Sequence, residues 1–243
     1  MPDQPTLLAV LCLALATYVQ AATGFGFAIV AVATLPLLMS PHRAVEVMTV
    51  FNLLVTALTL WTHRRALQWR RILPLTLATF LSMPIGFFVV RHLDRVLLLR
   101  SLGVVLILIS AMDFWLRRHR LLALPGWTAW PLGTLGGTLG GAFGTGGPPI
   151  VAFVYSQGWD KSASVGALQV VFIVMSLTRN VLMGATGDFN SDLVSTVAWA
   201  VPPGLFAVWL GKRTLDRVPQ AHLRTVVFGA VFLLGIWYVM KPI

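Results

Sequence analysis

Two glycine-rich segments contain the residues of this sequence that could bind a ligand. The first holds Gly24, Phe25 and Gly26, and the second holds Gly144, Thr145, Gly146 and Gly147, directly before Pro148-Pro149. Glycine lets a backbone approach a ligand closely, and a proline in the first turn of a helix loses no hydrogen bond. A helix that begins at such a break leaves backbone N–H groups free, with the positive end of the helix dipole behind them. These groups bind an anion without any charged side chain, so both segments predict a site for a small anion.

Polar side chains recur at helical spacing within two apolar runs. One face would carry Thr49, Asn52, Thr56 and Thr59, and another Gln169, Ser176 and Asn180, with Arg179 beside it. Hydrogen bonding between helices is the simpler explanation for the threonines and Ser176. Asn52 and Gln169 start near the middle of their runs, so contact with a ligand is an equal alternative. Arg179 is either a functional residue inside the membrane or one that extends to the interface, and both alternatives stay open.

A third set of small residues lies between these segments. Glycines recur at spacings of three and four, at Gly133, Gly136, Gly137, Gly140 and Gly141. Small residues at this spacing let membrane helices pack closely. The pattern therefore predicts helix packing at these positions rather than ligand binding.

Other chemistry is not indicated by the sequence. Glu46 follows Arg43 by three residues and Asp113 precedes Arg117 by four, so both carboxylates are expected to be locally paired. The single cysteine, Cys12, lies in an apolar run. No metal-ligand cluster, nucleophile–base pair or phosphate-binding loop is present. The sequence therefore predicts neither an enzyme nor a bound cofactor or metal.

The elements that must position these residues are membrane helices. Of the 243 residues 57% are apolar and 11% are charged, about half the charge of a soluble domain. A membrane-spanning helix needs about 20 mainly apolar residues, and several runs approach or reach this length. They are Thr6–Ala22, Ala44–Thr62, Ile72–Val90, Val96–Leu116, Ser162–Gly184, Leu193–Leu210 and Leu223–Met240. The composition predicts an all-α polytopic membrane protein with the lipid bilayer as its surroundings.

The net charge of +10 is explained by topology. Arginines cluster between apolar runs, as in Arg64-Arg65, Arg70-Arg71 and Arg117-Arg118. Such clusters mark loops on the cytoplasmic side of a membrane, and no basic face remains for nucleic acid. We therefore expect a multi-pass protein of a bacterial-type inner membrane that does not bind nucleic acid.

The chain repeats itself at a spacing of roughly 120 residues. Four echoes occur in the same order: Gly24–Val30 with Gly144–Ile150, Pro84 and Gly86 with Pro202 and Gly204, Leu93–Val96 with Leu215–Val218, and Leu99–Ser101 with Leu223–Thr225. The sequence therefore predicts a first transmembrane repeat at 1–120 and a second at 121–243, within one integral membrane domain.

Loop charge indicates that the two repeats are inverted. The loop His63–Arg71 carries four arginines, whereas its counterpart Ala185–Asp192 has no basic residue and two aspartates. Equivalent loops on opposite sides require an odd number of crossings per half. Counting the short segments Phe25–Met39 and Pro148–Gln157 as crossings gives five per half and ten in all. The expected fold thus has about 8–10 membrane segments, including short broken or re-entrant helices. Short, Gly/Pro-interrupted segments at matching positions indicate a substrate site at mid-membrane.

The two breaks resemble those of the TauE/SafE sulfite exporter family. The resemblance rests on Thr23-Gly24-Phe25-Gly26-Phe27 and on the segment from Gly140 to Pro149, and it covers nearly the whole chain. It implies a permease, most simply an exporter, for sulfur-containing anions such as sulfite or organosulfonates. The alternative is a membrane-embedded assembly or regulatory subunit that transports nothing. A homo-oligomer is compatible with either expectation.

Overall fold

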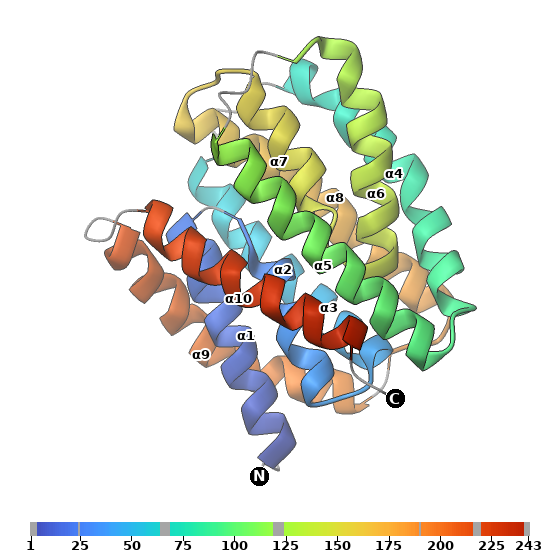
Figure 1. Cartoon of the computed structure of the whole chain (residues 1–243). Helices are drawn as coiled ribbons and strands as arrows, with labels where there is room; N and C mark the ends of the chain where they lie inside the picture. The colour runs from blue at the N-terminus through green and yellow to red at the C-terminus, as the bar shows by residue number, and fades with distance from the viewer. Residues whose placement is uncertain are drawn as a thin grey trace. The chain divides into compact units, whose positions relative to one another are not determined.

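The computed structural model of the chain is helical throughout the residues that it describes, which are 4–23, 25–63, 69–118, 124–189, 191–215 and 220–240 (Figure 1). The helices are α1 (Gln4–Thr23), α2 (Phe27–Thr34), η1 (Leu35–Leu37), α3 (Pro41–His63), α4 (Trp69–Arg91), α5 (Arg95–Arg118), η3 (Gly126–Thr128), α6 (Ala129–Phe143), α7 (Gly147–Ser156), α8 (Lys161–Ala185), α9 (Ser191–Leu215) and α10 (Gln220–Met240). The all-α fold expected from the sequence is confirmed.

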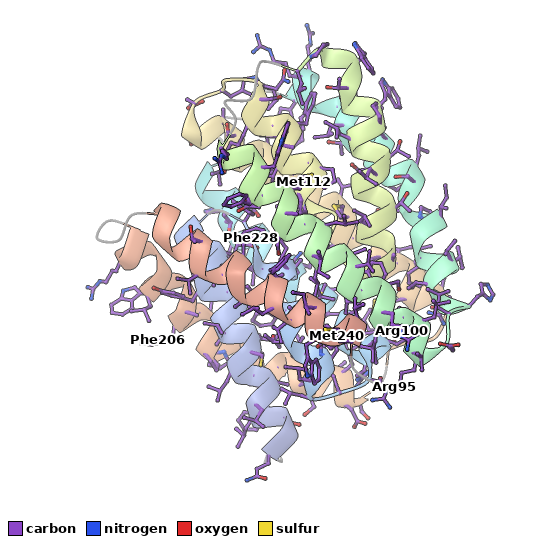
Figure 2. All side chains as sticks on the ribbon, in the orientation of Figure 1. Arg95, Arg100, Met112, Phe206, Phe228 and Met240 are labelled. Carbon is purple, nitrogen blue, oxygen red and sulfur yellow. The ribbon has the colours of Figure 1, made fainter. Side chains whose placement is uncertain are left out.

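The polytopic character is also confirmed. Among the described residues, α3, α4, α5, α8 and α9 are long and apolar enough to cross a membrane. Their outer surfaces are apolar as well: Leu81 is 64% exposed and Val181 is 69% exposed. Phe206 on α9 is 61% exposed and is labelled in Figure 2. Large apolar side chains on the outside of a helix bundle suit lipid rather than water.

The chain divides into two compact units, and each is described by itself. Unit 1 comprises residues 1–52, 93–111 and 186–243, and unit 2 comprises 53–92 and 112–185. Unit 1 therefore contains α1, α2, α9 and α10, and unit 2 contains α4, α6, α7 and α8, while α3 and α5 contribute to both. Each unit draws helices from both sequence repeats. The compact units describe packing and the repeats describe chain order, so the division at residue 120 stays a prediction.

Glycines on α6 bring this helix against the backbone of α4 in unit 2. A side chain at Gly137 would collide with the Thr79 carbonyl, and one at Gly141 would collide with the Met83 carbonyl. The Thr79 hydroxyl also donates a hydrogen bond to the Gly133 carbonyl oxygen at 3.2 Å. The contacts advance along both helices together, so α4 and α6 run parallel. The glycine spacing thus serves helix packing, as the sequence predicts.

In unit 1, α9 approaches the backbone of α1 closely at Gly211. A Cβ at Gly211 would lie 2.8 Å from the Tyr18 carbonyl oxygen and 3.2 Å from the Ala22 nitrogen. In unit 2, Gly86 of α4 meets the Thr138 carbonyl and the Ala142 nitrogen of α6. Tyr18 and Ala22 precede Thr138 and Ala142 by 120 residues, so the two contacts are equivalent under the sequence repeat.

The matching contacts of Gly86 and Gly211 differ from one pairing of the predicted repeat. The sequence matches Gly86 with Gly204, but Gly204 lies against the side chain of Phe51, where a Cβ would be 2.5 Å from the ring. Gly211 is the glycine of α9 that contacts a neighbouring helix as Gly86 does. The echo of Pro84 and Gly86 in Pro202 and Gly204 therefore does not follow the packing of these helices.

Candidate functional site: two helical hairpins with glycine turns

The second glycine-rich segment forms the turn between α6 and α7. Helix α6 ends at Phe143, and Gly144 adopts φ 71°, a left-handed conformation that favours glycine. Its N–H donates to the Gly140 carbonyl at 2.9 Å, which closes the last turn of α6. Thr145 and Gly146 follow, and α7 begins at Gly147. The break therefore lies where the sequence predicts it.

Helix α7 then returns beside α6. Gly140 lies next to the Gly146 nitrogen and Gly136 next to the Ile150 side chain, so the two helices are antiparallel. At the far end, Gln157 Nε2 donates to the Leu124 carbonyl at 3.1 Å, just before α6 begins. With 15 and 10 residues, α6 and α7 rise about 22 and 15 Å, less than the roughly 30 Å of membrane hydrocarbon. The pair is thus a helical hairpin that returns to the same end of unit 2, and the short crossing expected at Pro148–Gln157 stays a prediction.

The tip of this hairpin offers few hydrogen-bond donors. Pro148 and Pro149 occupy the first turn of α7 and have no N–H, so two of its usual free donors are missing. Within the described residues, no hydrogen bond engages the backbone N–H of Thr145 or Gly146. Thr145 is fully buried, and its hydroxyl also has no hydrogen-bond partner among the described residues. A buried polar group in this state costs about 1–3 kcal/mol, which a bound ligand or water would remove.

The other two glycines of the turn have different surroundings. A side chain at Gly146 would collide with the Gly136 carbonyl and with Met175 of α8, whose Cε would be 2.6 Å from a Cβ. A Cβ at Gly147 would meet the edge of the Phe172 ring at 3.7 Å, an ordinary contact. Gly146 is therefore required for packing, whereas Gly147 has room for a ligand or a small side chain. Sequence alone does not separate these two glycines.

Arg179 of α8 lies at the end of α6. Its Nη1 donates to the carbonyl oxygens of Gly141 and, at 3.3 Å, Gly140. The guanidinium carbon is 5.3 Å from the centre of the Phe87 ring, and the residue is 5% exposed. Arg179 therefore does not extend to an interface, which excludes one of the two alternatives given by the sequence. Its carbonyl partners lie 38 and 39 residues away, and no sequence pattern indicates them.

Gln169 is the other polar side chain of α8 that the sequence singles out. It is fully buried and precedes Arg179 by ten residues, which is about 15 Å along a helix. Its helix brings Phe172 and Met175 to the α6–α7 turn. Asn180 donates from Nδ2 to the Ser176 carbonyl at 2.7 Å, within α8 itself.

The first glycine-rich segment forms a similar hairpin in unit 1. Gly26 precedes α2 with φ 107°, and its carbonyl accepts from the Val30 N–H at 3.1 Å. The side chains of Cys12 and Thr34 share a hydrogen bond, so α2 also returns beside α1. Helix α2 has 8 residues and rises about 12 Å, far too little to cross a membrane. Gly24, the remaining glycine of this break, lies outside the described residues.

Aromatic rings surround this first break. Phe25 is 5% exposed and packs on Phe228 of α10 with ring centres 6.2 Å apart. Phe27, the first residue of α2, stacks on Phe51 of α3 at 5.9 Å. Asn52 is half-buried and directly follows Phe51. The break thus matches the second one in backbone form but is lined by apolar side chains.

The threonines of α3 bond mainly to their own helix. The hydroxyls of Thr49, Thr56 and Thr59 donate to carbonyls three or four residues earlier, as threonine commonly does in helices. Arg43 and Glu46 form the expected ion pair at 3.4 Å. The side chain of Arg117 lies outside the described residues, so its pairing with Asp113 stays a prediction. Among the described residues, no three His, Cys, Asp or Glu side chains form a metal-binding group.

Comparison with known proteins places these hairpins in a family. The family model for the sulfite exporter TauE/SafE matches residues 9–238, which include both breaks. A curated relative from Cupriavidus necator, named probable sulfite/organosulfonate exporter TauE, is 29% identical over 225 residues, covering 90% of this chain and 88% of the relative. No solved structure matches the chain. The match indicates a transporter rather than an enzyme, and the chain belongs to the sulfite exporter TauE/SafE family.

Proposed function

We propose that this protein exports small sulfur-containing anions, such as sulfite or organosulfonates, across a bacterial-type inner membrane. The observation that carries the proposal is the tip of the α6–α7 hairpin. There the unbonded Thr145 hydroxyl adjoins the N-terminal end of α7, with the N–H groups of Thr145 and Gly146 beside it. The oxygens of a sulfite or sulfonate group only accept hydrogen bonds when ionised, so they need donors of this kind. Family membership and the name of the Cupriavidus necator relative support the same substrate class.

The small number of hydrogen-bond donors at the α6–α7 turn suits the reversible binding that transport requires. A transported ion must be bound well enough to enter and weakly enough to leave. Pro148 and Pro149 remove two N–H donors, and no acidic or basic side chain belongs to the turn itself. A hydroxyl and a few backbone dipoles therefore attract an anion without the deep binding that direct contact with several arginines would give.

Transport would proceed by alternating access through the paired helix breaks of two inverted repeats. Two observations support this part of the proposal. Each repeat contains a helix, a glycine turn and a short helix that returns beside the first. Within unit 2, α4, α6 and α8 begin at the same end, and the loop charges favour the cytoplasmic side for this end.

Flux in proteoliposomes tests the function. The wild-type protein should move radiolabelled sulfite or a short alkyl sulfonate, and Thr145→Val should lower the flux about tenfold, because a hydrogen bond to a charged group is worth about 1.5–3 kcal/mol. Thr145→Ser should restore most of it. Thr138→Val is the matched control, since this exposed threonine of α6 bonds only within its own helix.

Each outcome of the flux measurement has a distinct meaning. A folded wild-type protein that moves neither anion contradicts the proposal and favours a non-transporting assembly or regulatory subunit. Wild-type flux that Thr145→Val leaves unchanged keeps the transporter but places its substrate away from the α6–α7 turn.

A further inference from the structure

The α6–α7 turn brings together two helix ends of opposite polarity. A helix carries about half a positive charge at its N-terminus and about half a negative charge at its C-terminus. The N-terminus of α7 would attract an anion, but the C-terminal carbonyls of α6 lie beside it, because Gly140 adjoins the Gly146 nitrogen. The two partial charges would nearly cancel. A bare hairpin of this shape is therefore a poor anion site.

Arg179 removes this difficulty. Its guanidinium donates to the carbonyls of Gly140 and Gly141, which are in the last turn of α6. One full positive charge at this position exceeds the half negative charge of the helix end, so the turn becomes positive overall. The surroundings strengthen the effect, because Arg179 is 5% exposed and the Phe87 ring lies 5.3 Å from its charged carbon.

We propose that Arg179 is a positioning residue that neutralises the C-terminal end of α6, so that the N-terminal end of α7 and Thr145 can bind the sulfite or sulfonate group. This inference rests on the proposed function of the same turn. Arg179 acts on the substrate through the carbonyls of α6, and Thr145 supplies the direct contact. The sequence placed Arg179 among the substrate-binding residues, and its hydrogen bonds to the carbonyls of Gly140 and Gly141 give it this indirect role.

The other hairpin argues that Arg179 is not needed for folding a hairpin as such. Gly26 and Gly146 are 120 residues apart, and the same spacing leads from Thr59 to Arg179. The predicted repeat therefore pairs Arg179 with a threonine in the first half, and the last turn of α1 contains no basic residue. The arginine occurs in the half whose turn contains the unbonded Thr145 hydroxyl.

Three substitutions at Arg179 separate charge from hydrogen bonding. Arg179→Lys keeps the charge and a donor, Arg179→Gln keeps a donor without the charge, and Arg179→Met keeps neither. Affinity for dianionic sulfite and for monoanionic methanesulfonate would be measured by calorimetry on purified protein, with thermal unfolding recorded in parallel. We expect Arg179→Lys to bind within about threefold of wild type, and Arg179→Gln and Arg179→Met to bind about tenfold or more weakly. The loss should be larger for sulfite, because it carries more charge.

The comparison of lysine with glutamine decides the outcome. Equal affinities of these two variants would show a purely structural role and overturn the inference, even if Thr145→Val still weakens binding as the proposed function requires. A loss in Arg179→Lys as large as in Arg179→Met would show that Arg179 binds the anion directly, which also overturns it. If Arg179→Met does not fold, the lysine–glutamine pair still gives the answer. Unchanged binding in Thr145→Val would instead contradict the proposed site itself, and the inference with it.

Discussion

The α1–α2 and α6–α7 hairpins have the same backbone plan and different chemistry. Both consist of a helix, a glycine turn and a short returning helix. The first turn is enclosed by Phe25 on Phe228, whereas the second contains a fully buried threonine with an unbonded hydroxyl. A membrane helix break is tolerated only where its backbone groups are covered by protein or line a polar cavity. In the first hairpin the turn is covered by protein side chains. The second hairpin fits a turn that lines a polar cavity.

Under the predicted repeat, this difference indicates that the two halves have different roles. The repeated features are those that build the hairpins, such as the close contact of Gly86 with α6 and of Gly211 with α1. The features that differ are those that would recognise an anion, namely Thr145 in place of Phe25 and Arg179 in place of Thr59. Substrate recognition would therefore depend mainly on the second repeat, although the fold uses both.

The largest test of the comparison concerns topology. In a Cys12→Ser background, single cysteines at Arg70 and Ser191 should label from opposite faces of the membrane, because the equivalent loops of inverted repeats lie on opposite sides. Cysteines at Trp127 and Gln157 should label from the same face as Arg70, since these residues flank the two ends of the α6–α7 hairpin. Impermeant maleimide on intact and permeabilised cells gives an all-or-none answer.

Two labelling results would contradict different parts of this predicted topology. Labelling of Arg70 and Ser191 from one face excludes inverted repeats. Labelling of Trp127 and Gln157 from opposite faces excludes both a re-entrant hairpin and a pair of short crossings, because each arrangement leaves these two residues on one face.

The next largest effect is on protein stability, at the turn between α6 and α7. Gly146→Leu should destabilise the protein by several kcal/mol, because the side chain would meet the Gly136 carbonyl and Met175 with no space to move into. Gly147→Ala is the matched control and should remain folded, since its new methyl group meets only the edge of Phe172. Recovery of monodisperse protein after detergent extraction distinguishes them. Equal recovery of both variants would show that Gly146 is free to face a ligand.

A smaller effect is expected from changing the energy source of transport. With the cytoplasm negative, expelling one negative charge gains about 2.3 kcal/mol per 100 mV, roughly fifty-fold in equilibrium terms. We expect a potassium–valinomycin potential to drive anion movement at symmetric pH without sodium. The matched variant is Asp113→Asn, because Asp113 is 3% exposed and is the buried carboxylate of the apolar part of α5. Potential-driven flux should survive this substitution, and flux that requires a pH gradient and is lost in Asp113→Asn would contradict the prediction.

Sequence predicts the parts of this structure that depend on local spacing. The breaks at Gly26 and Gly144 and the packing of Gly133, Gly137 and Gly141 follow from residue size and period. Whether α6 and α7 cross the membrane or form a re-entrant hairpin does not follow from the sequence, because both arrangements have the same length and leave later loops on the same sides.

Long-range partners are the other part that sequence misses. Arg179 contacts a helix end 38 residues away, and nothing in the pattern around either position encodes that distance. The sequence also does not show whether Gly204 or Gly211 makes the close helix contact on α9. Both are glycines on one helix, and only the packed neighbour reveals which of them permits a close approach to α1.

The smallest effect compares the two turn glycines themselves. Gly26 has φ 107° and ψ −8°, outside the regions that residues with a Cβ occupy, whereas Gly144 at φ 71° and ψ 8° is at the edge of the left-handed region. Alanine should therefore cost about 1–2 kcal/mol at Gly144 and more at Gly26. At about 2–4 °C per kcal/mol, thermal unfolding should show the larger decrease for Gly26→Ala. Gly229→Ala is the control, because a Cβ there has open space and alanine favours a helix, so its stability should not fall. If Gly26→Ala and Gly144→Ala lose the same stability, the two turns are interchangeable in backbone strain, and the difference between the hairpins is confined to their side chains.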